Sequence, residues 1–112
     1  MDTKGRLFEL RTYTANEGKL NDLLSRFENY TIRLFESHGM KIEGFWLPVE
    51  NAEQKLVYLL SYPSAEARED SWEKFQNDPE WISARDESNA NGDILANKES
   101  VYLTATAFSP LK

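Results

Sequence analysis

The sequence predicts an α+β fold in which one four-stranded antiparallel sheet carries helices on a single face. Four short segments are rich in branched and aromatic residues, as strands are, and longer segments repeat apolar residues every three or four positions, as helices do. Their order is strand, helix, strand, strand, helix, strand, which is the order of the ferredoxin-like split βαβ arrangement. A chain of 112 residues fits one domain, so residues 1–112 are expected to form a single unit.

The first predicted strand covers residues 7–14, LFELRTYT, whose side chains alternate between the two faces of an extended chain. One face carries the core-like residues Phe8, Leu10 and Thr12. The other face carries an acid, a guanidinium and a phenol, namely Glu9, Arg11 and Tyr13. We expect the apolar face to meet the helices and the polar face to point away from them.

The next segment predicts one long amphipathic helix over about residues 17–38, because its apolar residues recur three and four positions apart. Asn16 is expected to cap the start of the helix, and Glu17 suits the positive end of its dipole. Gly39 is expected to end the helix in a left-handed conformation.

The middle of the chain predicts a hairpin of two strands. Residues 40–49, MKIEGFWLPV, form the first strand, which Pro48 ends, and residues 55–62, KLVYLLSY, form the second. The sequence does not fix which face of this second strand, with its residues Tyr58 and Tyr62, points inward.

The last third predicts two helices, a loop and a strand. Ser64 is expected to cap a helix that ends near Asn77, and Asp78 to cap a short helix from Pro79 to about Ser88. We expect a loop in the turn-rich segment NANGDILANKE and a strand in SVYLTATAF, residues 100–108.

Charge and composition exclude several classes of partner. The formal net charge is -6, from 19 acidic and 13 basic residues, which is the wrong sign for binding nucleic acid. The chain has no cysteine, so disulfides, thiolate catalysis and thiolate-bound zinc are excluded and a reducing cytoplasm is permitted. No segment has the length of a membrane span, and MDTKGRL lacks the apolar core of a signal peptide. We expect a cytoplasmic protein without a membrane partner.

The strands predict a second copy of the chain as a partner. The segments LVYLLSY and VYLTATAF are apolar or aromatic on both faces, whereas a strand with one wet face alternates apolar and polar residues. The helices of one chain cover only one face of the sheet. Another copy of the same sheet would remove the second apolar face from water, so a homodimer or an assembly of dimers is expected.

These residues resemble the NIPSNAP family, within the dimeric α+β barrel group. The resemblance rests on FELRTYT, on LFESHGM followed by GFW, on LVYLLSYPSAEAREDSWEKFQNDPEW and on the final FSP, and it covers nearly the whole chain. It implies two ferredoxin-like units whose sheets face each other across a barrel. It implies no established reaction, although the wider group includes cofactor-free monooxygenases, isomerases and haem enzymes.

In such a barrel, Glu9, Arg11 and Tyr13 are expected to point between the two sheets. One interpretation makes Glu9 and Arg11 an ion pair at the dimer interface, since buried charges survive by pairing. The other makes the three residues a ligand site, in which Arg11 holds a carboxylate or enolate, Glu9 acts as acid or base and Tyr13 donates a hydrogen bond.

His38 is the single histidine, and it also has two interpretations. At the end of the long helix it suits the negative end of the dipole and the free carbonyls, and as an acid or base it suits catalysis. Arg68, Trp72 and Phe75 share a helical face and are interpreted as structural. We expect no bound metal, haem or flavin, because histidine is single, cysteine is absent and no Gly-rich phosphate loop occurs.

Two classes of function stay open at this point. One is an enzyme or binding protein that takes a small hydrophobic or aromatic molecule in its cleft without a cofactor. The other is a non-enzymatic dimeric module that recruits a protein. The polar residues of the first strand favour the first class, because a recruiting module is expected to show an exposed apolar patch or a disordered binding tail.

Overall fold

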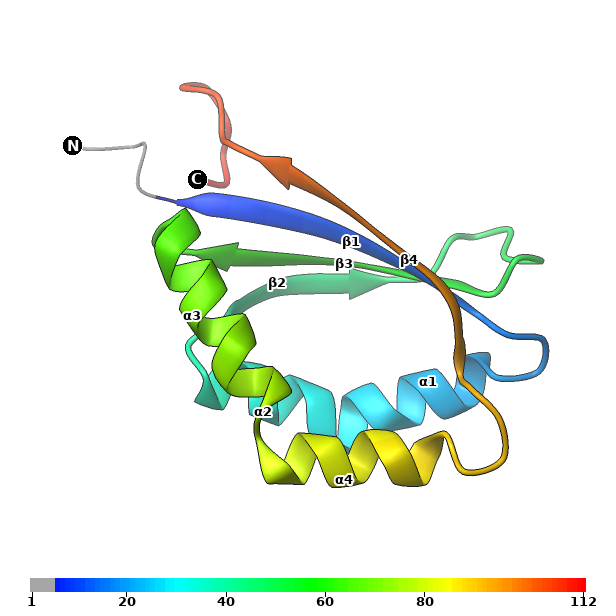
Figure 1. Ribbon diagram of the computed structural model, residues 1–112. Helices are drawn as coiled ribbons and strands as arrows, with labels where there is room; N and C mark the ends of the chain where they lie inside the picture. Colours follow the sequence, from blue (N-terminus) through cyan, green and yellow to red (C-terminus); the bar gives the residue numbers. More distant parts are fainter. Residues whose placement is uncertain (1–5) are drawn as a thin grey trace.

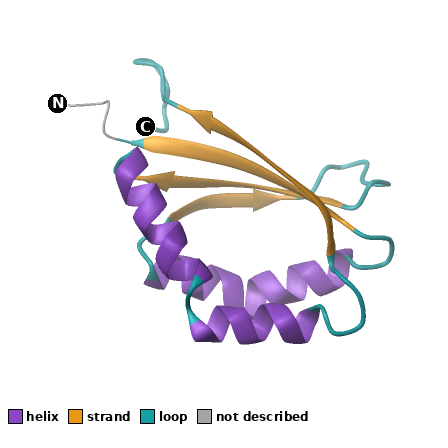
Figure 2. Cartoon of the chain, viewed as in Figure 1, coloured by secondary structure: helices purple, strands orange, loops and turns teal. Residues whose placement is uncertain are grey.

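The computed structural model describes residues 6–112 and shows an antiparallel sheet with helices on one face only (Figures 1 and 2). The elements in chain order are β1 (Leu7–Ala15), α1 (Leu20–Arg26), the π-helical segment η2 (Phe27–Thr31), α2 (Ile32–Ser37), β2 (Lys41–Trp46), β3 (Lys55–Tyr62), α3 (Ala65–Gln76), α4 (Pro79–Ser88) and β4 (Leu95–Leu103). The four strands lie in the order β2-β3-β1-β4, and every neighbouring pair is antiparallel. The predicted α+β, ferredoxin-like architecture is therefore confirmed.

The first helical run is continuous from Leu20 to Ser37 and begins later than predicted. Gly18 has a φ of 77°, which holds the preceding residues in a turn, and Lys19 occupies the N-cap position without a side-chain hydrogen bond. The predicted cap residue, Asn16, instead donates its side-chain amide to the carbonyl oxygen of Asp93. The predicted left-handed stop is confirmed, because Gly39 has a φ of 87°.

Both later helices begin where their caps predict. The hydroxyl of Ser64 accepts a hydrogen bond from the backbone N–H of Ala67, and a carboxylate oxygen of Asp78 accepts one from the N–H of Glu80. These bonds satisfy N–H groups that have no partner within the first helical turn. The local sequence therefore determined both helix starts.

The last strand differs from the prediction. β4 runs from Leu95 to Leu103, so part of the expected loop is strand and the segment after Leu103 is not. β4 is an edge strand that pairs with β1 alone, and most of its side chains are exposed. An edge strand of this kind tolerates polar residues, because backbone pairing holds it and its side chains need no burial.

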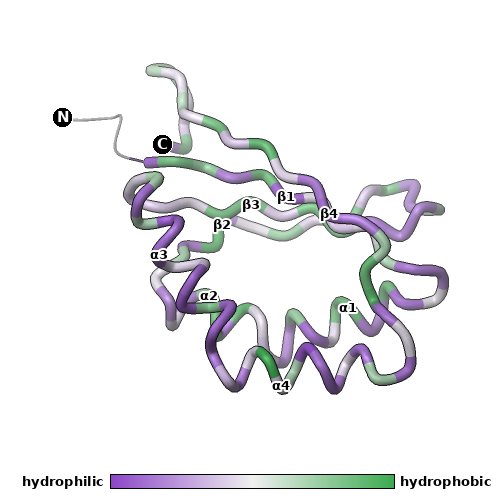
Figure 3. The backbone as a smooth tube through the Cα atoms, in the orientation of Figure 1, coloured by the Kyte–Doolittle hydropathy of each residue, from purple (hydrophilic) through white to green (hydrophobic). Residues whose placement is uncertain are grey.

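The hydrophobic core lies between the sheet and the helices. Its largest fully buried side chains include Tyr58, Leu60 and Tyr62 from β3 and Leu23 and Phe35 from the helical run. Figure 3 shows hydrophobic and hydrophilic residues alternating along the helices, as expected for helices with one buried side. None of the helices within residues 6–112 is long and apolar enough to cross a membrane.

The opposite face of the sheet, here called the outer face, has no helix over it (Figure 1). Leu10 on β1 pairs with Leu59 on β3 and with Val101 on β4, so three apolar side chains form a row across this face. Leu10 and Leu59 are half-buried, and Val101 is 54% exposed. The outer face therefore carries an apolar row that is partly accessible in the single chain.

Candidate functional site

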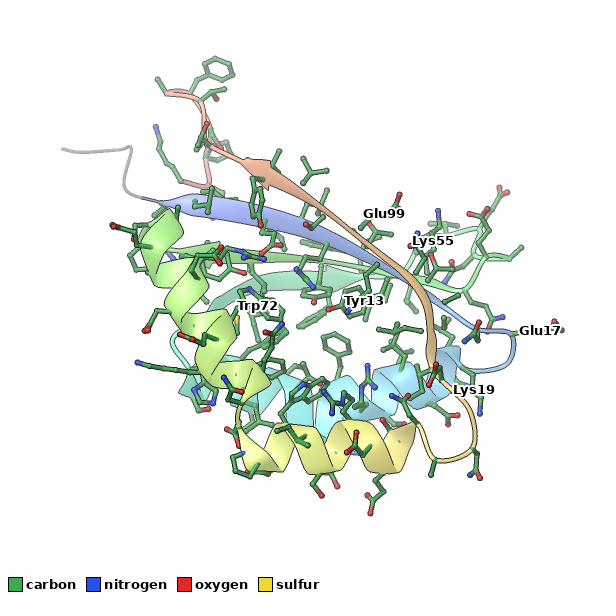
Figure 4. The ribbon with its side chains drawn as sticks, viewed as in Figure 1. Tyr13, Glu17, Lys19, Lys55, Trp72 and Glu99 are labelled. Atoms are coloured by element: carbon green, nitrogen blue, oxygen red, sulfur yellow. The ribbon has the colours of Figure 1, made fainter. Side chains whose placement is uncertain are left out.

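The structure places Glu9, Arg11 and Tyr13 on the helix side of the sheet, so the face predicted for them is wrong. Arg11 contacts Trp72 of α3, and Figure 4 shows Tyr13 and Trp72 between the sheet and the helices, with Glu99 on the other side. Phe8, Leu10 and Thr12 must then belong to the outer face. The prediction failed because Glu9, Arg11 and Tyr13 satisfy one another by ion pairing and hydrogen bonding inside the domain. The alternate residues of β1 therefore lie on the face without helices.

Glu9 is the centre of a buried hydrogen-bond network. One carboxylate oxygen accepts from the Tyr62 hydroxyl at 2.7 Å and from Arg68 Nε at 3.1 Å, and the other accepts from Arg11 at 2.7 Å and from Arg68 at 3.2 Å. Burial raises the pKa of Glu9, but hydrogen bonds from Arg68 and Tyr62 and the two guanidinium charges hold that pKa below its usual range. Glu9 is therefore a carboxylate with four donors, which makes it a weak base and a poor acid.

Arg11 is held equally firmly. Its Nε donates to the Tyr58 hydroxyl at 2.9 Å, one terminal nitrogen donates to the Tyr13 hydroxyl at 2.9 Å, and the other donates to Glu9. The guanidinium carbon lies 4.4 Å from the centre of a Trp72 ring. Burial alone would lower the pKa of Arg11, but the phenols and the Glu9 carboxylate raise it. Glu9 and Arg11 do form an ion pair, but it lies within one chain under the helices rather than at a dimer interface on the face predicted for it.

Four residues of the network, Tyr58, Tyr62, Arg68 and Trp72, were not assigned to a site from the sequence. Arg68, interpreted as structural, binds both oxygens of Glu9, and Trp72 donates its indole N–H to the Tyr62 hydroxyl at 2.8 Å. Burial raises the pKa of Tyr62, so its hydroxyl stays protonated and can donate to Glu9. The sequence did show that Arg68 and Trp72 share one helical face. It did not show that this face contacts β1, because that contact depends on how the whole chain folds.

A cavity of about 1110 Å³ lies beside this network, between the sheet and the helices. Its aromatic and apolar lining includes Tyr13, Phe27, Phe35, Trp72, Phe75 and Trp81. Its basic lining consists of Arg11, Arg26, Arg68, Arg85 and Lys98, and its acidic lining of Glu69, Asp70, Glu73 and Asp93. The cavity therefore combines aromatic walls with charged groups of both signs.

Arg26 differs from the other buried guanidiniums of the cavity. Only 6% of this residue is exposed, and one of its terminal nitrogens donates to the Ser88 hydroxyl at 3.1 Å. Its guanidinium carbon lies 5.1 Å from the centre of a Trp81 ring, and its Nε has no hydrogen-bond partner among residues 6–112. Burial lowers the pKa of Arg26, as expected for a cation removed from water.

His38 lies outside the lining of this cavity. Its Nε2 is 2.7 Å from a carboxylate oxygen of Asp78, the cap residue of α4, so its side chain bonds another helix rather than the carbonyls of its own. The hydrogen bond from His38 and one from the backbone of Glu80 lower the pKa of Asp78. The structure therefore gives His38 a role in joining α2 to α4.

The described residues contain no group of three or more histidine, cysteine, aspartate or glutamate side chains placed to hold a metal ion. The cavity lining contains four arginines and one lysine, which are donors suited to binding anions, beside four carboxylates.

The family model of the NIPSNAP proteins matches residues 8–110 of the sequence. The chain belongs to the NIPSNAP family. This agrees with the resemblance carried by the sequence motifs, and it covers every strand and helix of the fold from Phe8 onward. Comparison with curated proteins finds no match.

Solved structures share the fold. A NIPSNAP domain protein from Burkholderia xenovorans is 24% identical, with a TM-score of 0.79, over 93% of this chain and 98% of that one. A NIPSNAP family protein from Agrobacterium tumefaciens is 22% identical, with a TM-score of 0.85, and the match covers 99% of this chain and 97% of that one. SnoaB, a cofactor-independent oxygenase from Streptomyces nogalater, is 16% identical, with a TM-score of 0.61, and the match covers 95% of this chain and 98% of that one. At these identities the likeness concerns the fold.

Proposed function

We propose that this NIPSNAP-family chain binds a small hydrophobic or aromatic molecule, without a cofactor, in the cavity between its sheet and its helices. The observation that carries the proposal is the cavity of about 1110 Å³, whose aromatic walls adjoin a fixed network of polar groups. Ligand sites are typically concave and largely apolar, with a few polar groups that orient the ligand. The aromatic part of the lining has this character, although the charged residues make this cavity more polar than a typical ligand site. Its volume accommodates a molecule of several fused rings.

The network around Glu9 suits orientation of a ligand better than proton transfer. The lowered pKa of Glu9 keeps it ionised, while burial and the neighbouring Tyr13 raise the pKa of Tyr58 and so keep its hydroxyl protonated. Catalytic acids and bases work best when their pKa lies near the working pH. Any transformation would then depend on how the cavity positions the ligand, and the fold shared with the cofactor-independent oxygenase SnoaB supports chemistry of that kind.

The proposal includes a homodimer formed through the outer face. The row of Leu59, Leu10 and Val101 crosses this face, and Leu103 and Trp46 add to its exposed apolar surface. Covering such a surface removes apolar area from water, with a gain of about 25 cal/mol per Å². Pairing through the outer face leaves the cavity free, because the cavity lies on the helix side of the sheet. An exposed apolar face also suits the alternative, a protein-recruiting module, whose partner would take the place of the second copy.

Two matched tryptophan variants test where the ligand binds. Trp72→Phe is expected to weaken binding of naphthamide, a neutral aromatic probe, by about tenfold, because the variant removes part of the cavity wall and the indole bond to Tyr62. Trp46→Phe makes the same chemical change on the outer side of the sheet, so it is expected to leave the affinity unchanged. Isothermal titration calorimetry measures both. Equal losses in the two variants, or no binding by the wild-type protein, would contradict the proposed site.

A further inference from the structure

Arg26 is a buried cation without a counter-charge among residues 6–112. Arg11, which is buried, and Arg68, which is half-buried, both form ion pairs with Glu9, whereas Arg26 forms none with any described carboxylate. Its side chain contacts Ser88 and Trp81, and its Nε has no hydrogen-bond partner in the part of the chain that the structure describes. A buried charge without a partner destabilises a protein, so a fold that keeps one requires an explanation.

The position of Arg26 suggests that the missing partner is a ligand. Arg26 lines the cavity and directly precedes the π-helical segment η2, whose residues Phe27 and Thr31 line the same cavity. Segments of π-helix occur frequently at functional sites, because the wider turn changes the direction of neighbouring side chains. Two features needed to bind a ligand, a guanidinium without a carboxylate partner and an aromatic wall, therefore come from consecutive residues.

Two further cations line the cavity together with Arg26. Arg85 of α4 lines the cavity, and its charge contributes to the lowered pKa of Arg26. Lys98 of β4 lies opposite Tyr13 in the sheet and lines the cavity as well. Asp93 is an acidic residue of this part of the lining, and it forms no ion pair with Arg26. The remaining acidic residues of the lining, Glu69, Asp70 and Glu73, belong to α3.

We propose that Arg26 is the anion-binding residue of the cavity, and that the ligand is an aromatic or hydrophobic acid whose carboxylate binds the Arg26 guanidinium. The apolar part of the acid then lies against Phe27 and Trp72. This inference rests on the proposed function and specifies its ligand class. It transfers to Arg26 the role that the sequence suggested for Arg11, because Arg11 already donates to Glu9, Tyr13 and Tyr58.

A pair of probes that differ only in charge tests the inference. Naphthoate carries a carboxylate, and naphthamide has the same ring system without a charge. We expect Arg26→Met to weaken naphthoate binding at least about tenfold and to change naphthamide binding by less than about twofold, as for loss of a charge-assisted bidentate contact. Arg26→Lys, which keeps the positive charge, is expected to retain part of the naphthoate affinity.

Arg33→Met is the matched control, because Arg33 lies on the same helical run and pairs with Glu80 outside the cavity lining. It loses the same charge and is expected to bind both probes as the wild-type protein does. Arg26→Gln is measured in parallel, because it removes the charge but keeps a donor for Ser88 and so disturbs folding less. Calorimetric titration gives the affinities, and circular dichroism melting curves verify that each variant is folded.

The outcomes separate this inference from the proposed function. Selective loss of naphthoate in Arg26→Met and Arg26→Gln supports the inference. If both variants bind naphthoate as tightly as the wild type, or lose naphthoate and naphthamide equally, the anion-binding role is wrong while the cavity remains the ligand site. If the wild-type protein binds neither probe, the proposed function and the inference both fail.

Discussion

Glu9→Gln is expected to lower the free energy of unfolding by about 3–5 kcal/mol, the usual cost of removing one member of a buried charge network. The variant keeps the shape of the side chain but leaves Arg11 without a carboxylate and Arg68 without its buried one. Glutamine also has only one acceptor oxygen, whereas the donors around Glu9 bind two carboxylate oxygens. Urea unfolding monitored by circular dichroism measures the loss.

Glu69→Gln is the matched control for this variant. Glu69 binds the same Arg68 guanidinium, at 2.7 Å, but 74% of its side chain is exposed. Exposed ion pairs contribute little to stability, so Glu69→Gln is expected to lower the free energy of unfolding by a small fraction of the loss in Glu9→Gln. Similar small losses in the two variants would show that the buried network does not hold the sheet and α3 together.

The same network predicts how stability depends on pH. The pKa of Glu9 is lower in the folded protein than its usual value of 4.5, so the folded state holds the proton less tightly than the unfolded state does. The stabilisation from Glu9 is therefore fully present above pH 4.5 and is lost as the pH falls through the lower folded value. The difference in the free energy of unfolding between the wild type and Glu9→Gln is therefore expected to decrease in that acidic range.

Leu59→Asp is expected to convert the proposed dimer into a monomer, with a dimer dissociation constant raised at least about a hundredfold. Leu59 lies on the inner strand β3, in the apolar row on the outer face and beside Leu10, where a carboxylate would be buried without a partner. Analytical ultracentrifugation at micromolar concentrations measures the assembly.

Leu47→Asp is the control for the interface variant. Leu47 follows β2 and is 47% exposed, outside the row that crosses the outer face, so its replacement is expected to leave the dimer intact. A wild-type protein that sediments as a monomer would contradict the proposed interface, and so would a Leu59→Asp variant that remains a dimer.

The parts of the fold that the sequence predicted well depend on local interactions. β3 matches residues 55–62, and α4 matches residues 79–88, because dense β-branched and aromatic residues and a capping Asp–Pro pair are local signals. β4 begins about five residues before the predicted strand, because Asn97, Lys98 and Glu99 carry no strand signal in the sequence. Backbone pairing with β1 holds them in the strand.

The candidate site was predicted in its residues but not in its orientation. The alternation of Glu9, Arg11 and Tyr13 correctly placed them on one face, yet the rule that apolar residues face the helices assigned the wrong one. The choice between faces depends on Arg68 and Tyr62, which are more than 50 positions away in the sequence. Arg26 was not singled out, because an arginine in an amphipathic helix gives no sign that it lacks a carboxylate partner.

The central claim, that the ligand site lies between the sheet and the helices, is tested most directly by the indole N–H signals of the three tryptophans. Trp72 and Trp81 line the cavity, whereas Trp46 pairs with Val57 at the edge of the outer face and is 54% exposed. In proton–nitrogen correlation spectra, titration with naphthoate is expected to shift the Trp72 and Trp81 signals and to leave the Trp46 signal in place. A shift of the Trp46 signal alone would place the ligand on the outer face and contradict the account.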